Sequence, residues 1–426
     1  MKAVVFHGIG DIRLDNVPEP KIEHSQDAIV RLTASAICGT DLHMIRGTLS
    51  PMRPGTILGH EGVGVVQEVG RNVRNFKKGD RVVIGSSIAC GSCLFCRQGY
   101  YSQCDNANPN GPTAGTPFYG GTEDTGPFNG MQAEFVRVPY ANVNMLKLPE
   151  AVTDDQAILI SDIFPTGYFG ADLAQIKPGE IVAVFGCGPV GQFTIASAFL
   201  LNAARVVAID CVPDRLAMAR EQGAEVIDFN AEDPTEVIKE LTGGTGADRI
   251  IDAVGVDAEP PQHGPAAEKA EKQRKMFEQE LKKIAPDAKP QGELWKPGQA
   301  PSQVLHWAVE SVCKGGTISV IGVYPETMMW FPFGQAMGKN LTVQGGNCNH
   351  RRYIPKLIGL VQRGDIDPEK ILTKREPLMS AIEAFKAFDL RRPGWIKVEL
   401  EPQFDGEQPK PRFSVQETKP AGRGKR

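Results

Sequence analysis

The chain has 426 residues, 41% hydrophobic and 23% charged, which is enough for two or three domains with buried cores. Its net charge of −4 argues against a general nucleic-acid binder, and no apolar stretch approaches the roughly 18 residues that cross a bilayer. Met1–His7 is typical of a first strand, not of a targeting peptide. Nine cysteines suit a reducing compartment, so we expect a cytoplasmic protein.

Short strands with glycine-rich turns fill the chain up to about residue 150. We expect them at 28–34, 63–69, 81–84 and 134–138, among others. Many short strands separated by turn residues are typical of an all-β, barrel-like fold. The first part of the chain is therefore predicted to be a β-rich domain.

Four cysteines stand close together within this part, at Cys90, Cys93, Cys96 and Cys104. Thiolates this close in sequence can reach one point, and four of them match the closed tetrahedral site of a structural zinc. The alternatives are two local disulfides or four unrelated cysteines. Disulfides are disfavoured because a chain of this size needs no covalent stapling. We expect a zinc-stabilised loop that does no chemistry itself.

A second group of metal-ligand residues is spread more widely. Cys38 and the pair His60-Glu61 share the β-rich part with the zinc loop, and zinc takes thiolate and imidazole readily. Alone, each of them would more often be structural. A catalytic zinc needs three protein ligands and one open position, and the candidate for the third ligand is Asp162.

From about residue 154 the pattern changes to alternating strands and helices. Buried apolar strands are expected at 181–185, 205–209, 225–229, 249–254 and 317–321, with a helix at 192–201 after the first of them. Repeated βα units predict a parallel sheet covered by helices.

The first of these βα turns carries a glycine motif. Gly186 allows the tight turn, Gly188 lets the backbone approach a pyrophosphate, and Gly191 lets the helix pack on the strand. Asp210 ends the next apolar strand, where a carboxylate binds the ribose hydroxyls of NAD and repels a 2′-phosphate. The alternative for Asp210 is a helix-capping acid. With strand, glycines, helix and acid in register, dinucleotide binding is favoured.

Two stretches interrupt the pattern. Residues 256–302 are rich in Pro, Lys, Glu and Ala, and we expect an exposed insertion whose centre, 266–284, is a solvated helix. Contact with a neighbouring subunit is the alternative. The end of the chain, 401–426, has many charges and prolines and is predicted to be disordered.

These motifs together resemble the zinc-dependent medium-chain alcohol dehydrogenases, over roughly 1–255 and 303–400. The resemblance implies a GroES-like catalytic domain split around a Rossmann domain, with two zinc ions per chain and NAD. Many members have cysteine as the third catalytic ligand. Asp162 at that position is similar to the branch that contains formaldehyde dehydrogenase and formaldehyde dismutase, as are the segments 345–350 and 393–398.

The resemblance also implies roles for single residues. Thr40 corresponds to the hydroxyl that touches the substrate, His43 to the end of the proton relay, and Glu61 to the acid behind the zinc. Without it, Thr40 and His43 would be interpreted as a turn cap and a surface histidine. Thr166 and Val190 are expected beside the nicotinamide. The full implied cofactor-binding set is Thr166, Gly186, Gly188, Pro189, Val190, Gly191, Asp210, Arg215 and Lys397.

Within this set, Arg215 is expected near the adenosine ribose and Lys397 at the pyrophosphate. Gly39 stands where other members carry a phosphate-binding arginine, so that contact is absent or replaced. The implied mechanism is Lewis-acid activation of the substrate oxygen by zinc, loss of the proton through Thr40 and His43, and hydride transfer to NAD.

Three functions remain open on the sequence. The first is an NAD-dependent dehydrogenase of primary alcohols or hydrated aldehydes, and the second is an aldehyde dismutase that keeps its NAD bound. The third is a zinc-stabilised binding protein without catalysis. The expected partners are a small alcohol or aldehyde, with no nucleic acid or membrane, and further copies in a dimer or tetramer. The expected domains are 1–165 (catalytic), 166–340 (Rossmann), 341–400 (return to the catalytic domain) and 401–426 (tail).

Overall fold

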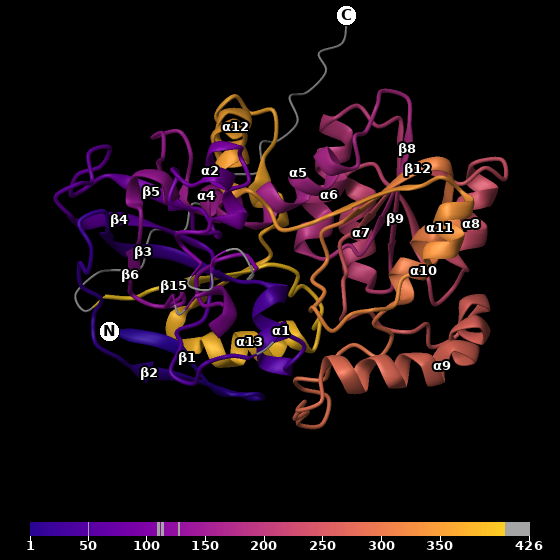
Figure 1. Cartoon of the computed structure of the whole chain (residues 1–426), viewed down its shortest axis with the longest axis horizontal. Helices are drawn as coiled ribbons and strands as arrows, with labels where there is room; N and C mark the ends of the chain where they lie inside the picture. Colours follow the sequence, from indigo (N-terminus) through magenta and orange to yellow (C-terminus); the bar gives the residue numbers. More distant parts are fainter. Residues whose placement is uncertain (50, 109–110, 112–114, 127, 405–426) are drawn as a thin grey trace, which may run out of the picture.

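The computed structural model describes residues 1–49, 51–108, 111, 115–126 and 128–404. Within these residues the chain forms two lobes side by side, one around a seven-stranded sheet and one around a six-stranded sheet (Figure 1). The predicted fold class, a GroES-like β-rich domain with a parallel Rossmann sheet, is confirmed. Most of the predicted tail, from 405 onward, lies outside the described residues.

The seven-stranded sheet combines the two ends of the chain. Its order is β14-β15-β3-β4-β5-β7, with β6 also beside β3, and β15 runs antiparallel to β3. In Figure 1 the late, yellow elements accordingly lie among the early, indigo ones. A separate hairpin, β1-β2, is joined to this lobe by isolated bridges from Ala3 to Ala133 and from Val5 to Ile57. The strands are β1 (Lys2–Gly8), β2 (Asp11–Asn16), β3 (Ala28–Ile37), β4 (Gly62–Val69), β5 (Arg81–Ile84), β6 (Phe135–Val138), β7 (Met145–Lys147), β14 (Lys374–Pro377) and β15 (Val398–Glu401).

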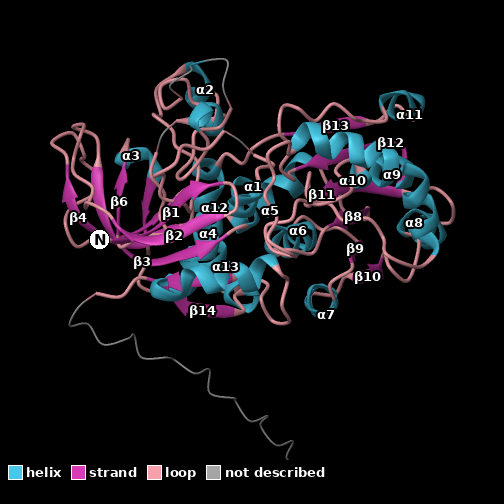
Figure 2. Ribbon diagram, turned by 90° about the horizontal axis from the view of Figure 1, so that it is seen from below, coloured by secondary structure: helices cyan, strands magenta, loops and turns pink. Residues whose placement is uncertain are grey.

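Helices of this lobe flank the sheet (Figure 2). They are α1 (Gly39–Arg46), α2 (Leu94–Arg97), α3 (Ala141–Asn144), α4 (Asp154–Ser161), α12 (His350–Gln362) and α13 (Ala381–Asp389), with short 3₁₀ turns η1 (Tyr101–Gln103), η3 (Glu123–Thr125), η4 (Pro368–Ile371) and η5 (Leu378–Ser380). Helix α5 (Ile163–Leu173) lies between the two lobes. A capping box starts α4, where Thr153 and Gln156 each bond the other's backbone N–H. Only Asp162 separates α4 from α5.

The six-stranded sheet is fully parallel, in the order β10-β9-β8-β11-β12-β13. The chain moves outward from β8 to β10 and then returns to the other side of β8. The strands are β8 (Ile181–Phe185), β9 (Arg205–Asp210), β10 (Glu225–Asp228), β11 (Ala247–Asp252), β12 (Val312–Val320) and β13 (Thr342–Gly345). The helices are α6 (Pro189–Leu200), α7 (Pro213–Glu221), α8 (Pro234–Leu241), α10 (Gln303–Ser311) and α11 (Phe333–Gly338). The reversal between β8 and β11 is the point where parallel sheets bind ligands.

The insertion departs from the expected solvated helix. Its helix α9 (Pro265–Ile284) buries one face, which includes Phe277 and Ile284. Glu280 on that face is fully buried and accepts hydrogen bonds from the backbone and hydroxyl of Ser302, at 3.1 and 2.7 Å. The predicted helix is present and most of its residues are exposed, but the prediction missed the buried face, because a sparse apolar set with many charges is also compatible with a helix that docks along one narrow face.

A continuous core joins the two lobes. Buried residues of β3 and α4 pack with α5, and α5 packs on α6 of the parallel sheet. Phe164 and Phe193 stack across this contact, with ring centroids 4.6 Å apart. The lobes are therefore held together by packed apolar side chains next to the glycine turn.

Candidate active site and metal centres

The cysteine loop folds around a single point. The four thiol sulfurs of Cys90, Cys93, Cys96 and Cys104 lie within 4.8 Å of one another, and the sulfurs of Cys93 and Cys104 are 4.0 Å apart. Tetrahedral zinc with Zn–S bonds of about 2.3 Å places sulfurs about 3.8 Å apart. Gly91 takes a left-handed φ of 75°, which the tight turn requires. These residues form the structural zinc site.

Backbone amides of the same loop stabilise the thiolates. The N–H groups of Ser92 and Cys93 both point at the Cys90 sulfur, at 3.3 Å. The Cys90 N–H reaches the Cys104 sulfur at 3.2 Å. Burial raises the pKa of Cys90, but the bonds from Ser92 and Cys93 outweigh it and lower the pKa overall. At Cys90 the loop thus favours the deprotonated form that zinc binds.

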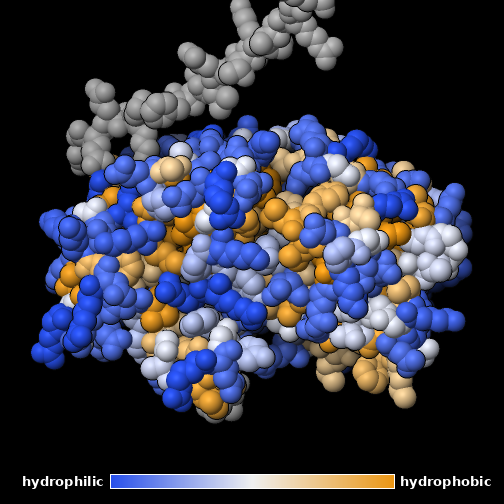
Figure 3. Space-filling view, turned by 90° about the horizontal axis from the view of Figure 1, so that it is seen from above, coloured by the Kyte–Doolittle hydropathy of each residue, from blue (hydrophilic) through white to orange (hydrophobic). Residues whose placement is uncertain are grey.

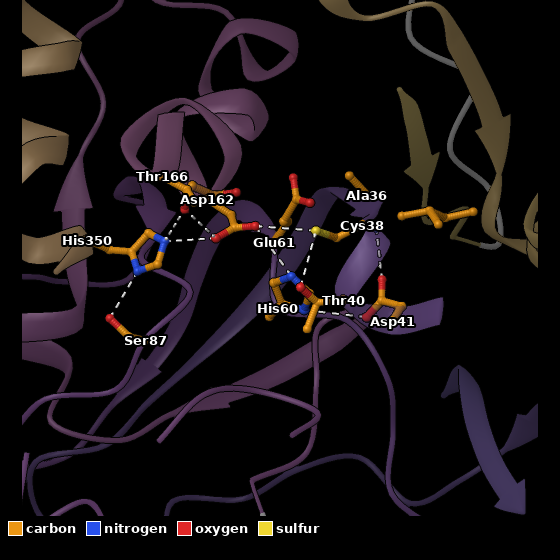
Figure 4. A network of polar contacts seen from close by, with 12 residues as sticks. Ala36, Cys38, Thr40, Asp41, His60, Glu61, Ser87, Asp162, Thr166 and His350 are labelled. Atoms are coloured by element: carbon orange, nitrogen blue, oxygen red, sulfur yellow. Dashed lines mark hydrogen bonds and ion pairs between the residues drawn. The ribbon is translucent and has the colours of Figure 1, made fainter. Parts of the chain in front are cut away.

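The second metal centre combines three distant segments. Cys38 precedes α1, His60 and Glu61 precede β4, and Asp162 lies between α4 and α5. Asp162 Oδ2 is 3.6 Å from the Cys38 sulfur and 3.4 Å from His60 Nε2 (Figure 4). Ligand atoms about 2.0 to 2.3 Å from a tetrahedral zinc lie about 3.4 to 3.6 Å apart. The residues present therefore fit a catalytic zinc.

Asp41 supports this centre from behind. Its Oδ2 accepts the N–H of Cys38 and the amide of Gln132, both at 3.0 Å, and its Oδ1 lies 3.4 Å from His60 Nδ1. His60 Nε2 is therefore left free to face the metal position. The sequence analysis assigned no role to Asp41.

The charges of the centre call for a cation. Burial raises the pKa of Asp162, but hydrogen bonds from His350 and His60 outweigh it and hold the pKa well below its usual value. Burial lowers the pKa of His60, but Asp41 and Cys38 outweigh it and raise the pKa well above its usual value. A buried cluster with this excess of acidic groups is the environment that a divalent ion neutralises.

The structure corrects the predicted role of Lys397. Its side chain is fully buried, with Nζ 2.5 and 2.7 Å from the two Glu61 carboxylate oxygens and 3.1 Å from the Ile37 carbonyl. Lys397 therefore does not reach toward a pyrophosphate. The buried carboxylate of Glu61, directly behind His60, requires a cationic partner, and Lys397 supplies it.

His43 meets an acid that the sequence did not indicate. Its Nδ1 lies 3.0 Å from Asp257 Oδ2 and 3.0 Å from the Thr48 hydroxyl. Asp257 belongs to the insertion and also binds Arg46, at 2.6 Å. Burial raises the pKa of Asp257, but Arg46 and His43 outweigh it and hold it far below its usual value. The imidazole of His43 therefore faces an ionised carboxylate.

The glycine turn has the predicted local geometry, and Asp210 lies at the end of β9 beside it. Gly186 has a φ of 89°, and a side chain at Gly191 would lie 1.8 Å from the Gly186 carbonyl oxygen. The Asp210 carboxylate accepts backbone N–H bonds from Cys187, at 2.8 Å, and from Cys211, at 2.7 Å. The guanidinium of Arg215 is 3.8 Å from it.

One cavity of about 840 Å³ connects the two halves of the site. Cys38, His60 and Asp162 line one end, and Gly188 and Asp210 line the other. Thr40, His43, Thr166, Pro189, Val190 and Arg215 also border it. A metal centre and a dinucleotide turn at opposite ends of one cavity are what a metal-dependent oxidoreductase with a diffusible hydride carrier requires.

Comparisons with known proteins agree with this class. Residues 24–150 match the family model described as "Alcohol dehydrogenase GroES-like domain", and residues 189–260 match "Zinc-binding dehydrogenase". An uncharacterised zinc-type alcohol dehydrogenase-like protein of Bacillus subtilis is 39% identical over 406 residues, which covers 94% of this chain and 100% of that protein. The chain belongs to the zinc-type alcohol dehydrogenase family, for which NAD is the typical cofactor.

Two further matches bear on the site. The glutathione-independent formaldehyde dehydrogenase of Pseudomonas aeruginosa is 40% identical over 281 residues, 63% of this chain and 69% of that protein. The structure of an alcohol dehydrogenase from Thermus sp. ATN1 superposes with a TM-score of 0.77 at 32% identity, covering 95% of this chain and 100% of that one. Among the described residues, no helix is both long and apolar enough to span a membrane.

Proposed function

We propose that the chain is an NAD-dependent dehydrogenase of a primary alcohol or of a hydrated, formaldehyde-like aldehyde. The observation that carries the proposal is the donor set of the catalytic site, in which Asp162 stands beside a thiolate and an imidazole. A bound zinc would supply Lewis-acid chemistry. A carboxylate ligand donates less electron density than a softer thiolate, so it lowers the Lewis acidity of the zinc less. The similarity to a formaldehyde dehydrogenase supports this substrate class.

The chain's own residues provide a route for the proton. The Thr40 hydroxyl lies 3.9 Å from the Cys38 sulfur on the cavity wall, where it can accept a hydrogen bond from a substrate hydroxyl and take up its proton while passing its own proton onward. His43 borders the same cavity, and the ionised Asp257 beside its Nδ1 stabilises the ring when it becomes protonated. At the far end, Asp210 and the N-terminus of α6 provide the ribose and phosphate contacts of a dinucleotide.

A second candidate is a dismutase that keeps its NAD bound and reduces one aldehyde while it oxidises another. The observation in its favour is that the insertion contributes Lys283, Ile284 and Pro286 to the same cavity as Asp210. Residues added over the cofactor end of a cavity increase the buried contact area and slow cofactor release.

Cofactor analysis and turnover distinguish these functions. The purified protein is denatured, and the released nucleotide is measured. Turnover of short alcohols and aldehydes is then followed with and without added NAD, with Asp162→Ala as the inactive control. Free NADH that accumulates only with added NAD supports the dehydrogenase. Aldehyde consumption without added NAD, giving equal alcohol and acid, supports the dismutase.

Absence of turnover on every short alcohol and aldehyde, in protein that holds two zinc ions, would contradict both functions. It would favour the non-catalytic binding protein instead.

We also propose that the enzyme is a cytoplasmic homo-oligomer. Strand β13 is the last strand of the parallel sheet, and Val343 on it is 44% exposed. Large apolar side chains close to it in sequence, Met329, Phe333 and Met337, are also exposed. Figure 3 shows hydrophobic residues interspersed with hydrophilic ones on one face of the molecule. An open strand edge with apolar neighbours is suited to pairing with a second copy. Light scattering after size exclusion tests this, and a monomer at micromolar concentration would contradict it.

A further inference from the structure

A second histidine, His350, reaches the catalytic centre from the far end of the chain. It is the first residue of α12 and is 5% exposed. Its Nε2 lies 2.8 Å from Asp162 Oδ1, and its Nδ1 lies 3.0 Å from the Ser87 hydroxyl. Figure 4 shows His350 on the side of Asp162 opposite Cys38 and His60.

The two oxygens of Asp162 consequently have different surroundings. Oδ2 faces the metal-ligand atoms of Cys38 and His60, at 3.6 and 3.4 Å. Oδ1 faces His350, at 2.8 Å, and the hydroxyl of Thr166, at 3.4 Å. A carboxylate without such partners can bind a metal through either oxygen or through both. The hydrogen bond to Oδ1 leaves Oδ2 as the oxygen that points at the metal position.

The backbone does not explain this orientation. Asp162 occupies the position before the first turn of α5, where an aspartate side chain usually accepts an N–H of the helix. Here it makes no such bond. The Asp162 carbonyl accepts the N–H of Thr166 at 3.0 Å, which is the ordinary first bond of the helix, so only the side chain departs from the usual N-cap arrangement. The side chain is therefore directed by its partners in the site.

We propose that His350 is a positioning residue that holds Asp162 as a ligand through one oxygen. The Asp162 carboxylate can only accept, so it favours a proton on Nε2 of His350, and the Ser87 hydroxyl is then available as a donor to Nδ1. When the Ser87 hydroxyl donates to Nδ1, Nε2 keeps its proton and donates it to Asp162 Oδ1. The inference concerns metal binding and does not depend on which substrate the enzyme oxidises.

Two substitutions at His350 separate this role from simple packing. The amide nitrogen of His350→Gln can occupy the place of Nε2 and donate to Asp162. His350→Asn places its polar group near Nδ1, too far back to reach Asp162. The control is Tyr353→Phe, one turn later on the same helix. It removes a 2.8 Å hydrogen bond from Tyr353 to Asp172, which also joins α12 to α5 but does not touch the metal centre.

The first readout is zinc retention at the catalytic site, measured by competition with a chelator while the structural zinc is counted separately. We expect His350→Asn to weaken catalytic zinc binding about 10- to 100-fold. His350→Gln and Tyr353→Phe should stay within about threefold of the wild type. Ser87→Ala should weaken binding in the same direction as His350→Asn, but less.

The second readout is the visible spectrum after Co²⁺ replaces the catalytic zinc, because these bands report ligand geometry. His350→Asn should change the bands, and His350→Gln should restore them. Wild-type zinc affinity and an unchanged spectrum in His350→Asn would overturn the proposal. Equal losses in His350→Asn, His350→Gln and Tyr353→Phe would also overturn it, because they would show a packing role. If His350→Asn does not fold, Ser87→Ala decides, and wild-type binding and spectrum in that variant would overturn the assignment.

Discussion

The structural zinc site takes its four donors from one short stretch, Cys90 to Cys104, whereas the catalytic site takes its donors from segments around 38, 60 and 162. In the first site, the donors and the amides that point at the thiolates all belong to one loop, so the arrangement of the donors depends on the ion that they share. In the second site, Cys38 is the single residue between β3 and α1, and Asp162 is the single residue between α4 and α5. The packed core therefore shapes that site before a metal binds.

This difference predicts opposite consequences of losing a ligand. A loop that is organised by its ion loses structure together with the ion. A centre that is preformed by the core loses chemistry and keeps its fold. The following predictions test this contrast, from the largest expected effect to the smallest.

Asp162→Ala should reduce turnover about a thousandfold or more, because Lewis-acid activation supplies several kcal/mol and each 1.4 kcal/mol is about tenfold in rate. The melting temperature and the structural zinc should be retained. Steady-state kinetics, calorimetry and metal analysis measure the three quantities. Near-normal activity with full catalytic zinc would show that another residue is the third ligand, and Glu61 would be the first to examine.

Cys93→Ser should have the reverse profile. Loss of one thiolate from a closed four-sulfur site should release the structural zinc, lower stability by about 3 kcal/mol or more and promote aggregation. Soluble protein should keep the catalytic zinc. The measurement is zinc content per chain together with the unfolding midpoint. A fully stable Cys93→Ser protein that holds two zinc ions would contradict the assignment.

The dinucleotide site is intermediate between these two cases. Its glycine turn follows β8, and Asp210 ends the next strand, β9, so its parts are neither in one loop nor in distant segments. We expect the wild type to prefer NAD over NADP by about a hundredfold, since a buried like-charge contact with the 2′-phosphate costs a few kcal/mol. Asp210→Gly should weaken NAD binding and reduce the preference, with Arg215 free to meet the phosphate. The test is kcat/KM with both cofactors. Equal use of NADP by the wild type would show that Asp210 does not face the ribose.

The smallest effect is expected at Asp257, the acid that the insertion brings to His43. Asp257→Asn keeps the shape but removes the charge that faces His43, so kcat should fall about tenfold with little change in KM. It also removes one counterion of the buried Arg46, so the melting temperature should fall as well. Zinc content should not change. The control is Glu280→Gln, elsewhere in the insertion and away from the cavity. An unchanged kcat in Asp257→Asn would mean that His43 does not depend on the insertion.

The features that could be predicted from the sequence are those encoded by residues close together in the chain. The spacing of Cys90 to Cys104 was sufficient for the structural zinc site, and Gly186 to Gly191 after an apolar strand was sufficient for the dinucleotide turn. Strands β5 and β8 have the predicted bounds because their burial follows directly from apolar runs. The catalytic ligand set needed a family resemblance in addition, since no local pattern links Cys38 to Asp162.

The missed contacts join residues that only the fold brings together. His350 follows Asp162 by 188 residues, and Lys397 follows Glu61 by 336. No periodicity or spacing indicates such pairs. The buried Glu280 was missed for a related reason, because its partner Ser302 lies beyond the end of the helix.

Arg46 of α1 joins three remote parts of the chain, because its guanidinium forms ion pairs with two acids from other segments. Its guanidinium lies 2.6 Å from Asp257 of the insertion and 2.6 Å from Asp389 of α13. Removing the insertion to obtain a shorter enzyme would strand this buried cation without one of its two counterions, at a cost of about 3 to 5 kcal/mol. The same deletion would take away the partner of His43. A protein engineer who grafts this active site onto another scaffold therefore has to transfer the insertion with it.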